Sequence, residues 1–379
     1  MSWIPLHEPS ITEAEETAVL QTMQSGWLST AGPAVNQFEV DLAERIQVDF
    51  AVACNSGTSA LHMALLAEGV RENDLVIAPD ITFVATINAI RYVGASPVFI
   101  DVDPETWQLD LPLLEYWLEH NTELNNRGEL IKKDSKSRVA ALIMVDVMGS
   151  IADVDEAKRI AKKFHLPIIE DAAEALGSTY NAIPAGGLFD SGIISFNGNK
   201  IITCGAGGVY LTNDERKAER VRHLSTTSKT DGYRFIHDEI GYNYRMVNIL
   251  ATVGCAQLSR LDKILKQKQN IYDQYVQHLD AQSVGLQRHN GLVKWNNWLI
   301  TITVNNPDSI HEALLSEGID SRTIWAPMHD LHMNDGYAFI TEANVSKSLW
   351  KRTLSLPSSP NLQDHTIAQI CDIVNRQAL

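Results

Sequence analysis

The residues with the clearest potential for chemistry surround Lys200, in the stretch Ser195–Gly208, S-F-N-G-N-K-I-I-T-C-G-A-G-G. A short apolar strand is predicted over 192–196, just before this lysine, and three glycines after it mark a sharp turn. Burial lowers the pKa of a lysine, and the neutral amine is a nucleophile that can form a Schiff base. Taken alone, the pattern also fits a surface lysine in a glycine-rich hairpin.

A second candidate is the turn Asn55–Ser59, N-S-G-T-S, between a predicted strand over 50–54 and a predicted helix over 60–67. The N-terminus of that helix would offer free N–H groups and the positive end of a dipole, which suits an anion and most naturally a phosphate. A plain helix cap by Ser56 or Thr58 is the simpler alternative.

A third candidate is Asp171, which ends the apolar run Leu166–Asp171. A carboxylate at the end of a buried strand is costly unless it is paired, and a protonated heterocycle nitrogen would be a suitable partner. Local evidence supports equally well a second interpretation, in which Asp171 is the N-cap of a helix over 172–176.

The elements that must position these residues alternate as strands and helices. Alternation of this kind predicts parallel strands joined by right-handed crossovers, with helices on both faces of the sheet. Ligands gather at the carboxyl ends of such strands, where Gly57, Phe83, Asp171, Ser195 and Lys200 are all expected to lie. The polar segment 121–138 is expected to be a surface excursion. Helices are predicted over 12–24, 34–47, 82–92, 112–119, 153–164 and 213–223, and further strands over 74–78, 97–100, 139–145 and 167–170.

The last third of the chain has a different pattern. A long amphipathic helix is predicted over 248–279, and we place the domain change within it. A strand over 298–302 and helices over 309–316 and 367–375 then suggest a small α+β domain. The predicted division is a large domain over 1–250, with an N-terminal arm, and a small domain over 251–379.

Composition narrows the classes of function. The formal net charge of −16 argues against a nucleic-acid-binding surface, which needs clustered Lys and Arg. No stretch approaches 18 uninterrupted apolar residues, so no membrane span is expected. The cysteines are far apart and unpaired, and no partner lies at ligand spacing from His223 or His237, so neither a metal site nor a disulfide is predicted. A soluble cytoplasmic protein is the default expectation.

Five segments together carry a resemblance to a known family. Taken in their order along the chain and with the spacing between them, the five segments resemble the DegT/StrS-like pyridoxal-phosphate (PLP) sugar aminotransferases, of the aspartate-aminotransferase (type I) fold. That fold implies an α/β large domain, which binds the cofactor on a mostly parallel sheet flanked by helices, and a small α+β C-terminal domain. The segments are N-S-G-T-S-A-L-H-M-A-L-L-A from Asn55, P-D-I-T-F-V-A-T from Pro79, I-E-D-A-A-E-A-L-G-S from Ile169, S-F-N-G-N-K from Ser195 and H-D-E-I-G-Y-N-Y-R-M from His237.

The resemblance implies a catalytic pair. Lys200 matches the lysine that binds the cofactor covalently and later moves the proton, and because relatives with histidine there are dehydratases, lysine favours amino transfer. Asp171 matches the carboxylate that keeps the pyridinium nitrogen protonated, so that the ring can act as an electron sink. Phe83 matches the aromatic residue that stacks on the cofactor ring.

The resemblance also implies further cofactor contacts. Glu174 stands where the family has Gln, His or Glu near the 3-hydroxyl of the cofactor. Asn243 matches an asparagine that reaches the phosphate in the neighbouring subunit's site, which implies a homodimer with shared active sites. The phosphate-binding residues implied within the chain are Gly57, Thr58, Ser59 and Ser195.

Two positions have two interpretations each, and a third has one. Arg245 could hold a substrate phosphate or carboxylate, or form an ion pair at a dimer interface. His329 is either a substrate contact, by its family position, or a structural loop residue. Trp298, like Trp295, is most simply a packing residue.

The implied reaction is a two-stage transamination, with L-glutamate as the amino donor and a nucleotide-linked 4-keto-6-deoxy sugar as the acceptor. I-P-L-H-E-P near the N-terminus and I-W-A-P-M-H from Ile324 are similar to the subgroup that makes 4-amino sugars for legionaminic-acid or bacillosamine-like pathways. The expected substrate is UDP-2-acetamido-4-keto-2,6-dideoxyglucose. The alternatives are GDP-4-keto-6-deoxymannose, a dTDP-3-keto sugar or a cyclitol and, from a different class, a non-catalytic cofactor-binding sensor.

Overall fold

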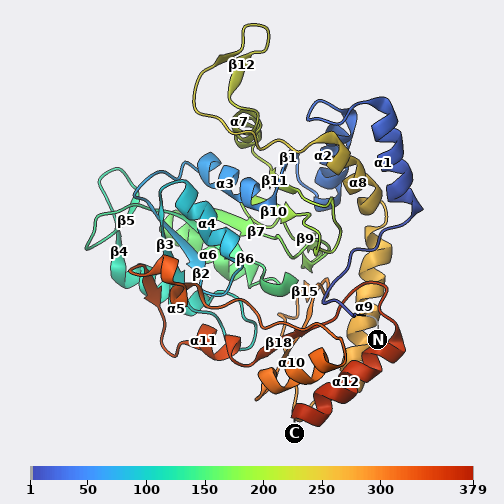
Figure 1. Cartoon of the computed structure of the whole chain (residues 1–379). Coiled ribbons are helices and arrows are strands. Elements are labelled where there is room, and N and C mark those ends of the chain that lie inside the picture. The colour runs from blue at the N-terminus through green and yellow to red at the C-terminus, as the bar shows by residue number, and fades with distance from the viewer. Residues whose placement is uncertain (1–2, 379) are drawn as a thin grey trace.

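An eight-stranded sheet lies at the centre of the computed structural model, which describes residues 3–378 (Figure 1). β11 runs antiparallel to both of its neighbours and the other neighbouring strands pair in parallel, so the sheet is mostly parallel, as predicted. β11 reverses direction because it follows β10 through the glycine-rich turn rather than through a helical crossover. In spatial order the strands are β1 (Phe50–Cys54), β11 (Gly208–Thr212), β10 (Ser191–Ser195), β7 (Ile168–Asp171), β6 (Val139–Val145), β2 (Leu75–Pro79), β3 (Ser96–Ile100) and β17 (Ala338–Ile340).

Helices cover both faces of this sheet, and alternate side chains of each strand enter two separate cores. Along β6, Ala141 and Ile143 join one core and Leu142 and Met144 join the other, as the two-residue period of a strand requires. The first core includes α2 (Pro33–Ile46), α3 (Gly57–Ala67), α4 (Val84–Tyr92) and α7 (Glu215–Ser225), and the second includes α5 (Leu111–Asn121) and α6 (Val154–Phe164). Burial on both faces explains why all seven residues of β6 are apolar.

A smaller antiparallel sheet organises much of the C-terminal part of the chain. It has a core of its own, which includes Ile271, Ile302 and Ile370. However, β17 from this part of the chain joins the large sheet beside β3, and the division at residue 250 stays a prediction. The elements are β14 (Gly285–Leu286), β16 (Ile300–Thr303), β18 (Thr353–Leu356), α9 (Leu261–His278), α10 (Pro307–Ser316), α11 (Val345–Trp350) and α12 (Asp364–Ala378).

The prediction of a single long helix over 248–279 is wrong. Two helices occupy the segment, α8 (Asn248–Leu258) and α9, and they are separated at Ser259–Arg260. The Arg260 guanidinium donates to the carbonyl oxygen of Ser10 at 3.0 Å and pairs with Glu15 at 2.5 Å. α8 packs against α2 and α1 (Glu13–Ser25). Apolar spacing did not reveal this break, because apolar residues recur on both sides of it, from Leu250 in α8 to Leu265 in α9.

The other predicted elements are confirmed, with their ends shifted by at most three residues. The polar segment 121–138 contains a small hairpin, β4 (Thr122–Leu124) and β5 (Leu130–Lys132). A second hairpin, β12 (Lys229–Asp231) and β13 (Ile236–His237), projects from the body of the molecule (Figure 1). Within the described residues, no helix is long and apolar enough to cross a membrane.

Candidate active site

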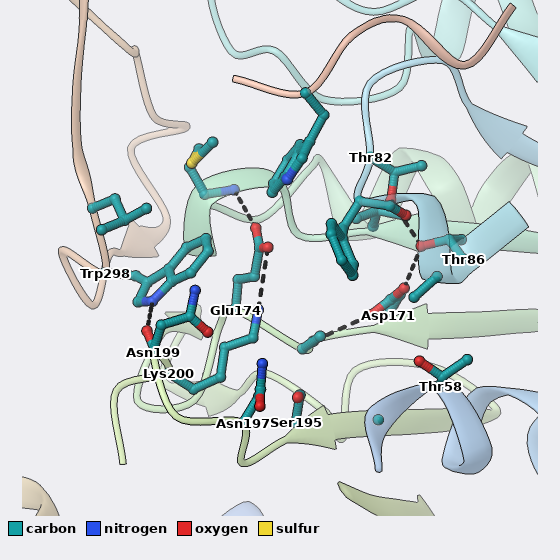
Figure 2. A pocket seen from close by; sticks show the side chains of 18 of the residues that line it. Thr58, Thr82, Thr86, Asp171, Glu174, Ser195, Asn197, Asn199, Lys200 and Trp298 are labelled. Carbon is teal, nitrogen blue, oxygen red and sulfur yellow. Dashed lines mark hydrogen bonds and ion pairs between the residues drawn. The ribbon is translucent and has the colours of Figure 1, made fainter. Parts of the chain in front are cut away.

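A cavity of about 510 Å³ opens at the carboxyl ends of the central strands. Figure 2 shows the side chains of residues that line it, with Lys200 extending towards Glu174. The topology of a parallel sheet explains the position, since successive strand ends meet at one edge. The predicted site residues that line the cavity are Gly57, Thr58, Phe83, Asp171, Glu174, Ser195 and Lys200.

The amine of Lys200 lies between a carboxylate and an indole ring. Its Nζ donates to Oε1 of Glu174 at 3.3 Å and lies 4.3 Å from the centroid of the Trp298 ring (Figure 2). The lysine side chain is only 13% exposed, so this is not the solvated surface lysine of the alternative interpretation. Trp298 is buried, as a packing residue would be, yet it also lines the cavity, and its Nε1 donates to the carbonyl oxygen of Asn199 at 2.8 Å.

Asp171 is buried at the end of β7, and two donors hold its carboxylate. Oγ1 of Thr86 donates to Oδ2 at 2.7 Å, and the amide of Ala173 donates to Oδ1 at 3.3 Å. Burial raises the pKa of Asp171, and the bond from Thr86 opposes that rise. No helix follows over 172–176, so Asp171 is not a helix N-cap. A carboxylate held in this way can pair with a cation in the cavity.

Glu174 is a buried carboxyl group beside Lys200. Burial raises its pKa to about 7, while the charge of Lys200 and the amide of Met148, which donates to Oε2 at 3.0 Å, act in the opposite direction. A carboxyl group with this pKa can take up and release a proton near neutral pH.

The N-terminus of α3 forms a narrow cradle at one end of the cavity. Oγ of Ser56 caps the helix by accepting from the amide of Ser59 at 3.0 Å, which leaves the amides of Gly57 and Thr58 for a ligand. A Cβ atom at position 57 would lie 2.9 Å from Cβ of Ser195, so only glycine fits there. The backbone donors of this cradle suit a phosphate group.

Ser59 is turned away from the cavity. Its hydroxyl donates to Oδ1 of Asn55 at 2.6 Å, and the residue is not among those that line the cavity. The structure therefore separates Ser59 from the other residues implied to bind phosphate. Phe83, in contrast, is 53% exposed, and its ring lies 6.5 Å from that of Trp325.

Asn243, Arg245 and His329 also lie outside the cavity lining. Arg245 forms a buried ion pair with Glu39 of the same chain, and its role at a substrate or a dimer interface stays a prediction. Nδ1 of His329 lies 2.6 Å from Oδ2 of Asp80, which supports the structural interpretation. Asn243 contacts Thr226 and Asn55 through its backbone, and its predicted role in a neighbouring subunit remains a prediction.

Several cavity residues were missed by sequence reasoning. Thr86 could have been found, because it lies one helical turn after Phe83 and so faces the same way. Arg322 and Trp325 come from the C-terminal part of the chain and give no local signal.

One further cluster lies away from the cavity, beside the β12–β13 hairpin. Nε2 of His223 is 2.8 Å from Asp238 and 3.5 Å from Glu239, and Arg220 already pairs with that glutamate. The three ligand atoms lie within 4.8 Å of one another, a grouping that the spacing of histidines in the sequence did not indicate.

Comparisons with known proteins identify the family of the chain. The profile of the DegT/DnrJ/EryC1/StrS aminotransferase family matches residues 9–375. The chain is 37% identical over 380 residues to the putative pyridoxal phosphate-dependent aminotransferase EpsN of Bacillus subtilis, covering 98% of this chain and 95% of the relative. It is 34% identical over 379 residues to the GDP-perosamine synthase of Escherichia coli O157:H7, and this alignment covers 99% of this chain and 98% of that relative.

A solved structure also superposes over the whole chain. The PMP-form of the putative sugar aminotransferase Spr1654 from Streptococcus pneumoniae has a TM-score of 0.89 at 26% identity, covering 100% of this chain and 98% of that one. The predicted fold is thus confirmed. On its sequence match and its structure, the chain belongs to the DegT/DnrJ/EryC1/StrS aminotransferase family.

Proposed function

We propose that this protein is a PLP-dependent aminotransferase that converts the ketone of a nucleotide-linked 4-keto-6-deoxy sugar into an amine, with L-glutamate as donor. The observation that carries the proposal is the arrangement of Lys200, Asp171 and the cradle at Gly57 in one cavity. This arrangement offers an amine, a buried carboxylate and a phosphate site to a single ligand, and PLP has a matching aldehyde, ring nitrogen and phosphate.

The residues of the cavity fit this cofactor. The amides of Gly57 and Thr58 and the hydroxyl of Ser195 would hold the phosphate, Asp171 would pair with the ring nitrogen, and Phe83 would cover the ring. The bound cofactor supplies an electron sink for the negative charge that develops on the substrate carbon.

The chain itself supplies proton transfer and electrostatics. Nζ of Lys200 can accept a proton from the substrate carbon and return it to a neighbouring position, and Glu174, 3.3 Å away, can balance the charge of the lysine. Thr86 and the amide of Ala173 favour the charged form of Asp171, which a protonated nitrogen requires as its partner.

The relatives bear on the nucleotide of the acceptor. Three of them, between 32% and 34% identical, are GDP-perosamine synthases, which favours GDP-4-keto-6-deoxymannose over the UDP-linked acetamido sugar expected from the sequence. We therefore place the GDP-linked sugar first and retain the UDP-linked sugar as the second candidate. A homodimer that shares its active sites through Asn243 is part of the same proposal.

Mass spectrometry of the reaction products tests the function. Purified protein, PLP and L-glutamate are incubated with either keto sugar, and Lys200→Ala is compared with Lys294→Ala, an exposed lysine outside the cavity. An amino-sugar product from wild type and Lys294→Ala, absent with Lys200→Ala, is expected. If glutamate converts the cofactor to its amine form and neither sugar reacts, the acceptor is wrong. If the cofactor binds and neither half-reaction occurs, the sensor alternative is favoured.

A further inference from the structure

The indole ring of Trp298 presents its face to the amine of Lys200. Nζ of Lys200 lies over this ring, 4.3 Å from its centroid, and 3.3 Å from Oε1 of Glu174 (Figure 2). Trp298 is 3% exposed and lines the cavity. A cation within about 6 Å of an aromatic centroid is attracted by the negative face of the ring, and indole gives the strongest attraction. Two neighbours of different kinds therefore stabilise the positive charge of Lys200.

Hydrogen bonds fix the indole ring at its edge and along its backbone. Nε1 of Trp298 donates at 2.8 Å to the carbonyl oxygen of Asn199, the residue directly before Lys200. The Trp298 amide donates to Oδ1 of Asn296 at 3.0 Å, and the Trp298 carbonyl oxygen accepts from Nζ of Lys268 at 2.5 Å. Asn296 and Lys268 are both buried. Contacts at three points leave the ring little freedom to turn away from the amine.

Asn296 also connects Trp298 to Glu174. Its Nδ2 donates to the carbonyl oxygen of Glu174 at 2.7 Å, while its Oδ1 accepts from the Trp298 amide. A side-chain amide that is buried and hydrogen-bonded through both of its polar atoms holds its partners at a fixed spacing. A short segment of the C-terminal part of the chain thus sets the position of both neighbours of the Lys200 amine.

Proton transfer gives this arrangement a function. In the proposed reaction, Nζ of Lys200 is neutral before it accepts a proton from the substrate carbon, and it is an ammonium group until it returns that proton to the neighbouring position. The face of an indole attracts the ammonium form far more strongly than the neutral amine. We propose that Trp298 is a positioning residue for amino transfer, which holds the Lys200 amine beside the cavity and stabilises it while it carries the proton. This inference rests on the proposed function, which gives Lys200 that proton.

Acetylation of the cofactor-free protein tests the inference without turnover. Acetic anhydride reacts with neutral amines only, and mass spectrometry of the peptide that contains Lys200 gives the rate at this one lysine. The rate at alkaline pH, where the amine is neutral, reports how accessible it is. The rate at neutral pH divided by the alkaline rate, called here the normalised rate, therefore reports the neutral fraction alone.

The variants separate the ring face from packing. Trp298→Met removes the ring and leaves an adaptable apolar side chain, and Trp298→Phe keeps a weaker aromatic face. Trp295→Met is the matched control. Trp295 belongs to the same segment and its Nε1 also donates to a backbone carbonyl oxygen, that of Met148 at 2.7 Å, but it does not line the cavity.

We expect the normalised rate of Lys200 to rise about 2- to 30-fold in Trp298→Met, the range for one cation–π interaction. Trp298→Phe should show a smaller rise of the same sign, which keeps the test available if the methionine variant does not fold. Trp295→Met should match wild type. In the cofactor-loaded enzyme, Trp298→Met should convert the cofactor to its amine form with glutamate more slowly, at little change in glutamate affinity.

A wild-type normalised rate in the folded Trp298 variants would overturn the inference, as would an equal rise in Trp295→Met. A protein in which Trp298→Met changes the acetylation of Lys200 as expected, and which transfers no amino group, would refute the proposed function alone.

Discussion

The buried carboxylate of Asp171 depends on one hydroxyl, and Thr86→Val removes that hydroxyl with little change in side-chain size. Thr86 is 1% exposed and donates at 2.7 Å, whereas the other donor, the amide of Ala173, lies at 3.3 Å. In the variant, Asp171 keeps only the longer bond. Its charged form becomes more costly, and its pKa rises further above the ordinary value.

The size of this effect follows from the type of bond that is lost. A hydrogen bond to a charged group contributes about 1.5–3 kcal/mol. Its loss should raise the pKa of Asp171 further in the variant. The same free energy is lost from its pairing with a protonated ring nitrogen, so PLP should bind about 10- to 100-fold more weakly.

Titration of the cofactor-free protein with PLP, followed by absorbance, measures this loss. Thr82→Val is the matched control, because Thr82 is also 1% exposed and its hydroxyl contacts that of Thr86, at 2.7 Å, rather than Asp171. Its effect should be clearly smaller. A folded Thr86→Val protein with wild-type affinity for PLP would refute the reasoning, as would equal losses in the two variants.

Three further predictions each concern one residue. Because burial raises the pKa of Glu174 from 4.5 to about 7, the folded state holds a proton that the unfolded chain has released between these values. The unfolding free energy of the cofactor-free protein should therefore fall as pH rises through this window, and urea unfolding should show a flatter fall for Glu174→Gln; an unchanged slope would contradict the pKa. Gly57→Ala should weaken PLP binding at least about 10-fold by crowding the cradle, whereas Gly198→Ala, with open space around its new methyl group, should bind normally; equal affinities would argue against a phosphate at this position. Lys268→Met leaves two buried carbonyl oxygens without their donor and should lower the unfolding free energy by about 2–5 kcal/mol in urea, and a value like that of wild type would show that water replaces the amine.

Much of the fold was predictable because local patterns of apolar and polar residues in the sequence specify it. Apolar runs such as Val139–Val145 are buried on both faces of a sheet, and their alternation with amphipathic segments implies parallel strands. The carboxyl ends of those strands then bring Gly57, Asp171 and Lys200 to one edge without any knowledge of side-chain packing. Local patterns failed at the break between α8 and α9, where Arg260 contacts the distant Ser10 and Glu15.

The sequence by itself thus determined the sheet, the strand ends and the residue types that meet there. Only the tertiary structure decided which side chains share the cavity. Trp298 and Arg322 reach it because the C-terminal part of the chain packs against the sheet, and no spacing within a segment encodes that approach. Arg245 and His329 are excluded because each is held by an acidic partner from a distant segment, Glu39 and Asp80 respectively. A charged or polar side chain can serve a ligand only where folding leaves its donors or acceptors unpaired, and that depends on neighbours that the chain brings together in three dimensions.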